Sequence, residues 1–97
     1  MKPEILDEVS RLVQMDRDAV LEQGLAAFLR DRRRRLKLER REILSRYSAE
    51  DSSALEEMLR SGQVPDHPAW EDLITVENLE DTIRTLDAHL RDLPAPA

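Results

Sequence analysis

The two halves of this 97-residue chain carry opposite charge, and that asymmetry constrains its fold more than any other feature. Residues 30–46 hold nine Lys or Arg and three acidic residues, whereas residues 66–93 hold eight acidic residues and two Arg. Apolar residues recur at helical spacing in both segments, so both are expected to form long helices. Two rods of such opposite net charge attract each other most when they lie side by side. The pattern therefore predicts an antiparallel pairing of two long helices, within one chain or across a dimer.

The composition narrows the classes to which the protein can belong. The chain contains no Cys, which leaves neither a disulfide framework nor a thiolate metal site. Its first seven residues lack the apolar run of a secretory signal peptide, and the longest apolar run, residues 25–29, is too short to cross a bilayer. The net charge of −6 disfavours non-specific binding to nucleic acid or anionic lipid. We expect a cytoplasmic protein with no membrane partner.

The alternation of apolar periodicity and helix-breaking residues predicts one all-α domain. Two short helices are expected at 3–14 and 53–61, and two long ones at 17–47 and 67–93. No apolar alternation of period two is long enough for a strand. At 1.5 Å per residue the helix over 17–47 is about 45 Å long, whereas a compact chain of this size is roughly 30–35 Å across. The molecule is therefore expected to be an elongated antiparallel hairpin, or to have its exposed end covered by a second copy.

Capping and breaking residues set the expected helix ends. Pro3 suits a first helical turn, and Asp16 is a suitable N-cap for the second helix. The segment Ser53–Glu56 has the spacing of a capping box, and Gly62 is a stop signal. Asp66 or His67 is expected to cap the last helix.

The apolar residues of the long helices predict where they pack. In the last helix a spacing of three and four residues predicts a coiled-coil-like seam of Val76, Leu79, Ile83, Leu86, Leu90 and Leu93. In the basic helix one narrow stripe holds Leu25, Leu29, Leu36, Ile43 and Tyr47. Because this stripe is thin between residues 30 and 42, we expect a homodimer that covers it.

The first third of the chain resembles a known family. Pro3-Glu4-Ile5-Leu6-Asp7-Glu8, followed by Met15-Asp16-Arg17-Asp18-Ala19-Val20-Leu21-Glu22-Gln23-Gly24-Leu25-Ala26-Ala27-Phe28-Leu29, resembles the two helices of ribbon-helix-helix antitoxins. The resemblance implies that Met15 is the corner residue and that the second helix forms an intertwined dimer. Together with the stripe, it places the following residues in a dimer core: Leu21, Leu25, Phe28, Leu29, Leu36 and Ile43.

The resemblance does not extend to DNA reading. The DNA-reading strand of that family precedes its first helix, where this sequence has only Met1 and Lys2. The resemblance therefore implies no operator-contacting residue. From Arg30 onward the sequence is similar to the toxin-neutralising or purely helical extensions of small prokaryotic operon-encoded proteins. A toxin is accordingly the protein partner that the resemblance suggests.

A basic stripe is the candidate nucleic-acid contact. Arg30, Arg34, Lys37 and Arg41 lie on one side of the predicted long helix. Such a stripe can neutralise phosphates, but no aromatic residues interleave it to stack on bases. The acidic last helix offers the cations a partner within the protein. We therefore favour a solvated or ion-paired surface over a nucleic-acid interface.

The start of the last helix holds the candidate protein contact. Trp is enriched at the energetic centres of interfaces, so Trp70, Glu71, Asp72 and Leu73 are the predicted partner-binding residues. Trp70 can equally close the end of a core that has few other aromatics, and this is the interpretation we favour. Trp70 would both close the core and contact a partner if the core forms between two chains.

The sequence offers no residues for an enzyme. His67 and His89 have no companion at metal-ligand spacing, and no phosphate-binding glycine loop or nucleophile motif is present. We expect no cofactor and no catalysis. The favoured function is a protein-binding module, antitoxin-like or an operon partner, that occludes a surface of its partner. The alternatives are a dimeric nucleic-acid-binding regulator that uses the basic stripe, and a structural helical dimer.

Overall fold

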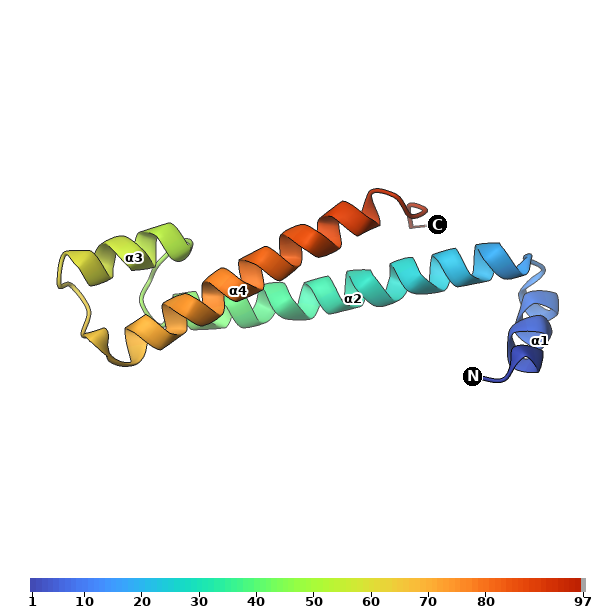
Figure 1. Ribbon diagram of the computed structural model, residues 1–97, viewed down its shortest axis with the longest axis horizontal. Helices are drawn as coiled ribbons and strands as arrows, with labels where there is room; N and C mark the ends of the chain where they lie inside the picture. The colour runs from blue at the N-terminus through green and yellow to red at the C-terminus, as the bar shows by residue number, and fades with distance from the viewer. Residues whose placement is uncertain (97) are drawn as a thin grey trace.

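The structure, a computed structural model, describes residues 1–96 and is all-α over that range. Four helices follow one another: α1 (Pro3–Val13), α2 (Arg17–Ser45), α3 (Ser52–Arg60) and α4 (Asp66–Leu90). Figure 1 shows α2 and α4 running antiparallel as a long hairpin, with α3 at its closed end and α1 across the beginning of α2. The radius of gyration is 19.2 Å and the extents are 60 × 23 × 16 Å. The predicted all-α, elongated fold class is confirmed.

The N-terminal ends of α2 and α3 are capped by aspartates. The Asp16 carboxylate accepts a hydrogen bond from the Ala19 N–H at 2.7 Å, as predicted. At α3 the Asp51 carboxylate accepts from the Ala54 N–H at 2.8 Å. The predicted capping box that begins at Ser53 is therefore wrong, and α3 starts one residue earlier. A carboxylate also interacts favourably with the positive end of the helix dipole, which a Ser hydroxyl does less well.

The first three helices end in the same way, with one residue in the left-handed region. These residues are Gln14 (φ 56°), Ser48 (φ 54°) and Gly62 (φ 76°). The following residue then donates its N–H to a carbonyl in the last helical turn, as Gln63 does to Met58 at 2.9 Å. This is the Schellman arrangement, which satisfies carbonyls that the helix leaves free. Gly62 is confirmed as a stop, and the turn at Ser48 ends α2 at residue 45 rather than 47.

The range of α4 includes a kink near its beginning. Pro65 precedes a short first turn, and the long continuous part of the helix begins after His67, which occupies the N-cap position there with Pro68 as the first helical residue, within the pair Asp66 or His67 predicted as the cap. His67 has non-helical backbone angles, and the His67–Pro68 peptide is cis. The residue before a proline is sterically disfavoured in the helical region. At the other end, α4 stops at Leu90 because residues 91–93 form a turn before Pro94.

The hydrophobic core lies at the closed end of the hairpin. Its buried members come from α2, α3 and α4: Ile43, Leu44, Leu55, Leu73, Val76 and Leu79. Leu55 and Val76 are completely buried. Of the seam predicted in the last helix, Val76, Leu79 and Ile83 are buried, and the later members are half-buried. The beginning of α2 extends past the end of α4, so it receives no cover from that helix (Figure 1).

Candidate protein-interaction surfaces

Ion pairs join the basic and the acidic helix across the hairpin. Their separations and register fit an antiparallel pair of helices: Arg33–Asp87 at 2.8 Å, Arg40–Glu80 at 2.8 Å and Arg46–Asp72 at 3.4 Å. The two oppositely charged rods therefore do lie side by side, as the sequence predicts. Only part of the positive charge is neutralised in this way, because other cations of α2 point away from α4.

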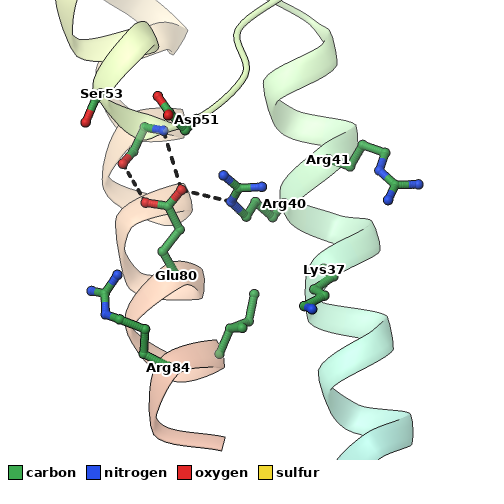
Figure 2. Close-up of a pocket in the computed structure, with 9 residues that line it drawn as sticks. Lys37, Arg40, Arg41, Asp51, Ser53, Glu80 and Arg84 are labelled. Carbon is green, nitrogen blue, oxygen red and sulfur yellow. Dashed lines mark hydrogen bonds and ion pairs between the residues drawn. The ribbon is translucent and has the colours of Figure 1, made fainter. Parts of the chain in front are cut away.

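Glu80 is the centre of the most enclosed of these contacts. Its carboxylate accepts hydrogen bonds from Arg40 Nε at 2.8 Å and from both the backbone N–H and the hydroxyl of Ser52 (Figure 2). Burial by itself would raise the pKa of Glu80. The hydrogen bonds from Ser52 and Arg40, together with the Arg40 charge, outweigh burial and hold the pKa below its ordinary value. One carboxylate thus fixes the beginning of α3 against both long helices.

Two of the predicted partner contacts face the interior of the chain. Leu73 is 3% exposed and belongs to the core. Asp72 accepts a hydrogen bond from the Tyr47 hydroxyl and pairs with Arg46. Burial, followed by this hydrogen bond and the Asp72 charge, raises the pKa of Tyr47 to about 12. The prediction that Leu73 and Asp72 contact a partner is therefore corrected, since both are used within the hairpin.

Trp70 is exposed, contrary to the favoured interpretation that it closes the core. Its exposed fraction is 55%, and Ala69 beside it takes the buried position. Ile74, one helical turn further on, is also exposed. Glu71 lies on the same exposed side and pairs with His67 Nδ1 at 2.7 Å. We call these three residues, Trp70, Glu71 and Ile74, the Trp70 patch. From the sequence, Ile74 is expected to extend the apolar seam at the start of the last helix and is not among the predicted partner contacts, although its spacing of four from Trp70 places both on one side of the helix.

Most of the exposed large apolar side chains lie at the open end of the molecule. We call this set the N-terminal apolar face, and its members are Ile5, Val9, Leu12, Val13, Leu21, Leu25 and Phe28. Leu12 is 82% exposed and Phe28 is 63% exposed. Only Leu6 and Ser10 of α1 are buried. The predicted dimer-core residues Leu21, Leu25 and Phe28 are therefore accessible to a second chain, and Leu29 is half-buried.

The other two predicted dimer-core residues lie elsewhere. Ile43 is buried in the core of the single chain, and Leu36 packs against that core. The structure thus differs from the expectation that they meet a second chain. The physical reason is that α4 covers this part of the apolar stripe of α2, whereas it ends before the beginning of α2.

The basic stripe is divided between paired and unpaired cations. Arg30 donates a hydrogen bond to the Pro94 carbonyl, and Arg34 pairs with Asp31 at 3.0 Å on its own helix. The hydrogen bond from Arg34 is the largest influence on Asp31, whose pKa lies below its ordinary value. Within residues 1–96, Lys37 and Arg41 form no ion pair, and both are exposed. Figure 2 shows Arg41 pointing away from the Glu80 contact.

Nowhere in the described part of the chain do three side chains of His, Cys, Asp or Glu meet in a group that could hold a metal ion. None of the helices within residues 1–96 combines the length and the apolar character needed to cross a lipid bilayer. The surfaces that stand out are therefore those described above.

Comparison with known proteins places the chain in a family. A family model described as "Uncharacterized protein MJ0235 family" matches residues 1–96. The chain belongs to this family. No curated protein and no solved structure matches the chain. The description of the MJ0235 family states no biochemical role.

Proposed function

We propose that this member of the MJ0235 family is a cytoplasmic, non-enzymatic protein-binding module, antitoxin-like or an operon partner. It acts as a homodimer and occludes a surface of its partner protein. The observation that carries the proposal is the N-terminal apolar face, which leaves seven large apolar side chains uncovered at one end of an otherwise charged molecule. A concentration of exposed large apolar side chains at one end of a molecule is typical of interaction sites.

A second copy of the chain is the first occupant of this face. Leu21, Leu25 and Phe28 are spaced by four and three residues, so they form one side of α2 suited to helix–helix contact. Covering a half-exposed side chain of this size is worth about 1 kcal/mol. The combined faces of two chains then yield a free energy comparable to the roughly 4–15 kcal/mol that association costs. A symmetric contact uses the same face on both chains and closes the assembly as a dimer.

Charge substitution on the face tests the dimer. The double variant Leu25→Asp with Phe28→Asp should be monomeric, because each carboxylate would have to lose its hydration inside the interface. Light scattering should give twice the chain mass of 11.2 kDa for the natural protein and a single mass for the variant. Leu38→Asp is the matched control, since Leu38 is an exposed Leu of α2 outside the face. A natural protein that stays at 11.2 kDa at micromolar concentration contradicts the homodimer.

The Trp70 patch is the proposed contact with the partner protein. It combines an exposed aromatic and an exposed aliphatic side chain with acidic residues, of which Asp66, Glu71 and Glu77 are exposed. Such a surface fits an apolar depression with a basic rim on the partner. Trp in this setting often contributes a large share of the binding energy. The acidic helix would thus cover a basic and apolar surface of the partner.

Binding to the product of the neighbouring reading frame tests this contact. Trp70→Ala with Ile74→Ala should weaken binding by about thirtyfold or more, the effect of losing a residue worth about 2 kcal/mol at an interface. Leu38→Ala is the control, because it removes an exposed apolar side chain from the other long helix. Unchanged affinity of the folded double variant would remove the patch from the interface. If no neighbouring product binds the natural protein, the structural helical dimer is the better description.

A further inference from the structure

One edge of the hairpin is a groove lined by cations from both long helices. Two open cavities of about 530 Å³ each lie along this edge, and Arg84 lines both. Although α4 and the turn after it are strongly acidic, their two arginines, seven residues apart, both line this edge. We call the following set the basic groove: Arg33, Lys37, Arg40, Arg41, Arg84 and Arg91.

The acidic residues in the groove are already engaged. Glu80 accepts from Arg40 and Ser52, and Asp87 pairs with Arg33 at 2.8 Å. Asp51 caps α3 through its hydrogen bond to the Ala54 N–H. Lys37 and Arg41 form no ion pair within residues 1–96, and both line the cavity that contains Glu80. Figure 2 shows the Arg41 side chain directed outward, away from Glu80, where it is accessible to a partner. Arg84 is paired with Asp81 on its own helix, so the groove cations without an ion pair in residues 1–96 are Lys37, Arg41 and Arg91. The groove thus keeps positive charge in a chain whose net charge is −6.

The mostly charged lining of the groove includes two aliphatic side chains, the buried Ile83 and the half-buried Leu90, which we call its apolar floor. Ile83 lines the cavity beside Lys37, and Leu90 lines the one beside Arg33. A phosphate backbone makes no use of such residues, and the groove has no aromatic side chain on which bases could stack. A peptide that carries both carboxylates and aliphatic side chains uses the cations and the floor together. The combination favours an acidic amphipathic segment over a nucleic acid.

We infer that the basic groove binds an acidic amphipathic segment of the partner protein. Its carboxylates pair with Lys37 and Arg41, and its aliphatic side chains contact Ile83 and Leu90. From Arg33 to Arg41 the groove extends about 12 Å along α2, the length of two to three helical turns. This inference rests on the proposed protein-binding function and names the chemistry of the partner that a second surface recognises.

Labelled peptides test the inference on the full-length protein. A helical peptide of about twelve residues built from Leu and Glu should bind more tightly than an oligoglutamate of equal charge, because only the first contacts the apolar floor. Lys37→Glu with Arg41→Glu should weaken its binding by about tenfold or more, since two attractions become repulsions. Arg32→Glu with Arg35→Glu is the matched control. Arg32 and Lys37 are about 140° apart around the helix, so the control changes the same net charge away from the groove and should alter affinity by less than about twofold.

Three results would overturn the inference: no binding of the Leu/Glu peptide, equal weakening by both double variants, or tighter binding of a duplex DNA than of the peptide. The last result would assign the groove to a phosphate backbone, and its affinity would fall steeply with salt. Dimer mass and the effect of Trp70→Ala on partner binding do not involve the groove. If the peptide does not bind the groove, the proposed function therefore still holds. If the proposed function is wrong, the dimer mass and the partner-binding measurements show it.

Discussion

The two ends of this molecule differ in how far their apolar side chains are buried. At the closed end, Leu55 and Val76 are completely buried and Glu80 joins three helices through hydrogen bonds. At the open end, helices of similar apolar content leave Leu12 and Phe28 largely exposed. The difference arises because α3 and α4 fold back over the end of α2, whereas the short α1 and the segment Pro94–Pro96 cover only part of its first half. The closed end is complete within one chain, and the open end has apolar surface to offer another.

The largest expected effect is the loss of unfolding free energy on truncating a core side chain at the closed end. Leu55→Ala should lower the free energy of unfolding by about 3 kcal/mol, because it leaves a cavity among packed side chains. The loss should be the same at low and high protein concentration, as measured by urea unfolding followed by circular dichroism. Leu25→Ala should instead destabilise only at concentrations where the dimer forms, since dimerisation stabilises by mass action. A concentration-dependent loss in Leu55→Ala would contradict the independence of the closed end.

The hydrogen bonds of Glu80 should make the stability of the closed end depend on pH. Because the pKa of Glu80 is lower in the folded chain than its ordinary value of 4.5, its contribution is present above that pH and is lost as pH falls through the folded pKa. Glu80→Gln should therefore cost about 1–2 kcal/mol at pH 7, and the difference from the natural protein should shrink as the pH falls below 4.5.

Thermal or urea unfolding across this pH range measures that convergence. Glu77→Gln is the control, since Glu77 is exposed on the same helix and forms no ion pair within residues 1–96. A Glu80→Gln penalty that persists unchanged at low pH would show that the carboxylate charge is not what stabilises the closed end.

The turn that ends α2 gives the smallest expected effect. Ser48 has a φ of 54°, a conformation that glycine adopts without the steric cost of a Cβ. Ser48→Gly should raise the free energy of unfolding by up to about 1 kcal/mol, measured by urea unfolding. The equivalent change at the open end, Gln14→Gly, should have a similar effect, because the backbone there has the same geometry. A loss of stability in both variants would contradict the left-handed turns.

Much of the fold follows from local chemistry in the sequence. Asp16 before a run of helix formers, Gly62 after one, and the opposite charges of the two rods each predict a feature that the structure contains. Choices between near-equivalent neighbours could not be made in this way. Asp51 and Ser53 are both good caps, and only the position of α3 against Glu80 decides between them.

The surfaces were harder to predict than the helices. The size of Trp70 favours a buried position. The helical phase set by Leu73 and Val76 nevertheless places Ala69 inside and Trp70 outside. Ile43 and Leu25 belong to one stripe, and the sequence alone does not say that α4 covers the first and leaves the second exposed. The same apolar pattern is typical of a helix face that packs within one chain and of a helix face that packs against a second chain.

Hydrogen exchange as a function of protein concentration tests the contrast between the two ends most directly. Amides in residues 3–28 should become more protected as concentration rises, while those in residues 43–83 keep the protection they have in dilute solution. Protection that is independent of concentration over residues 3–28, or that rises equally in both regions, would contradict an open end completed by a second copy.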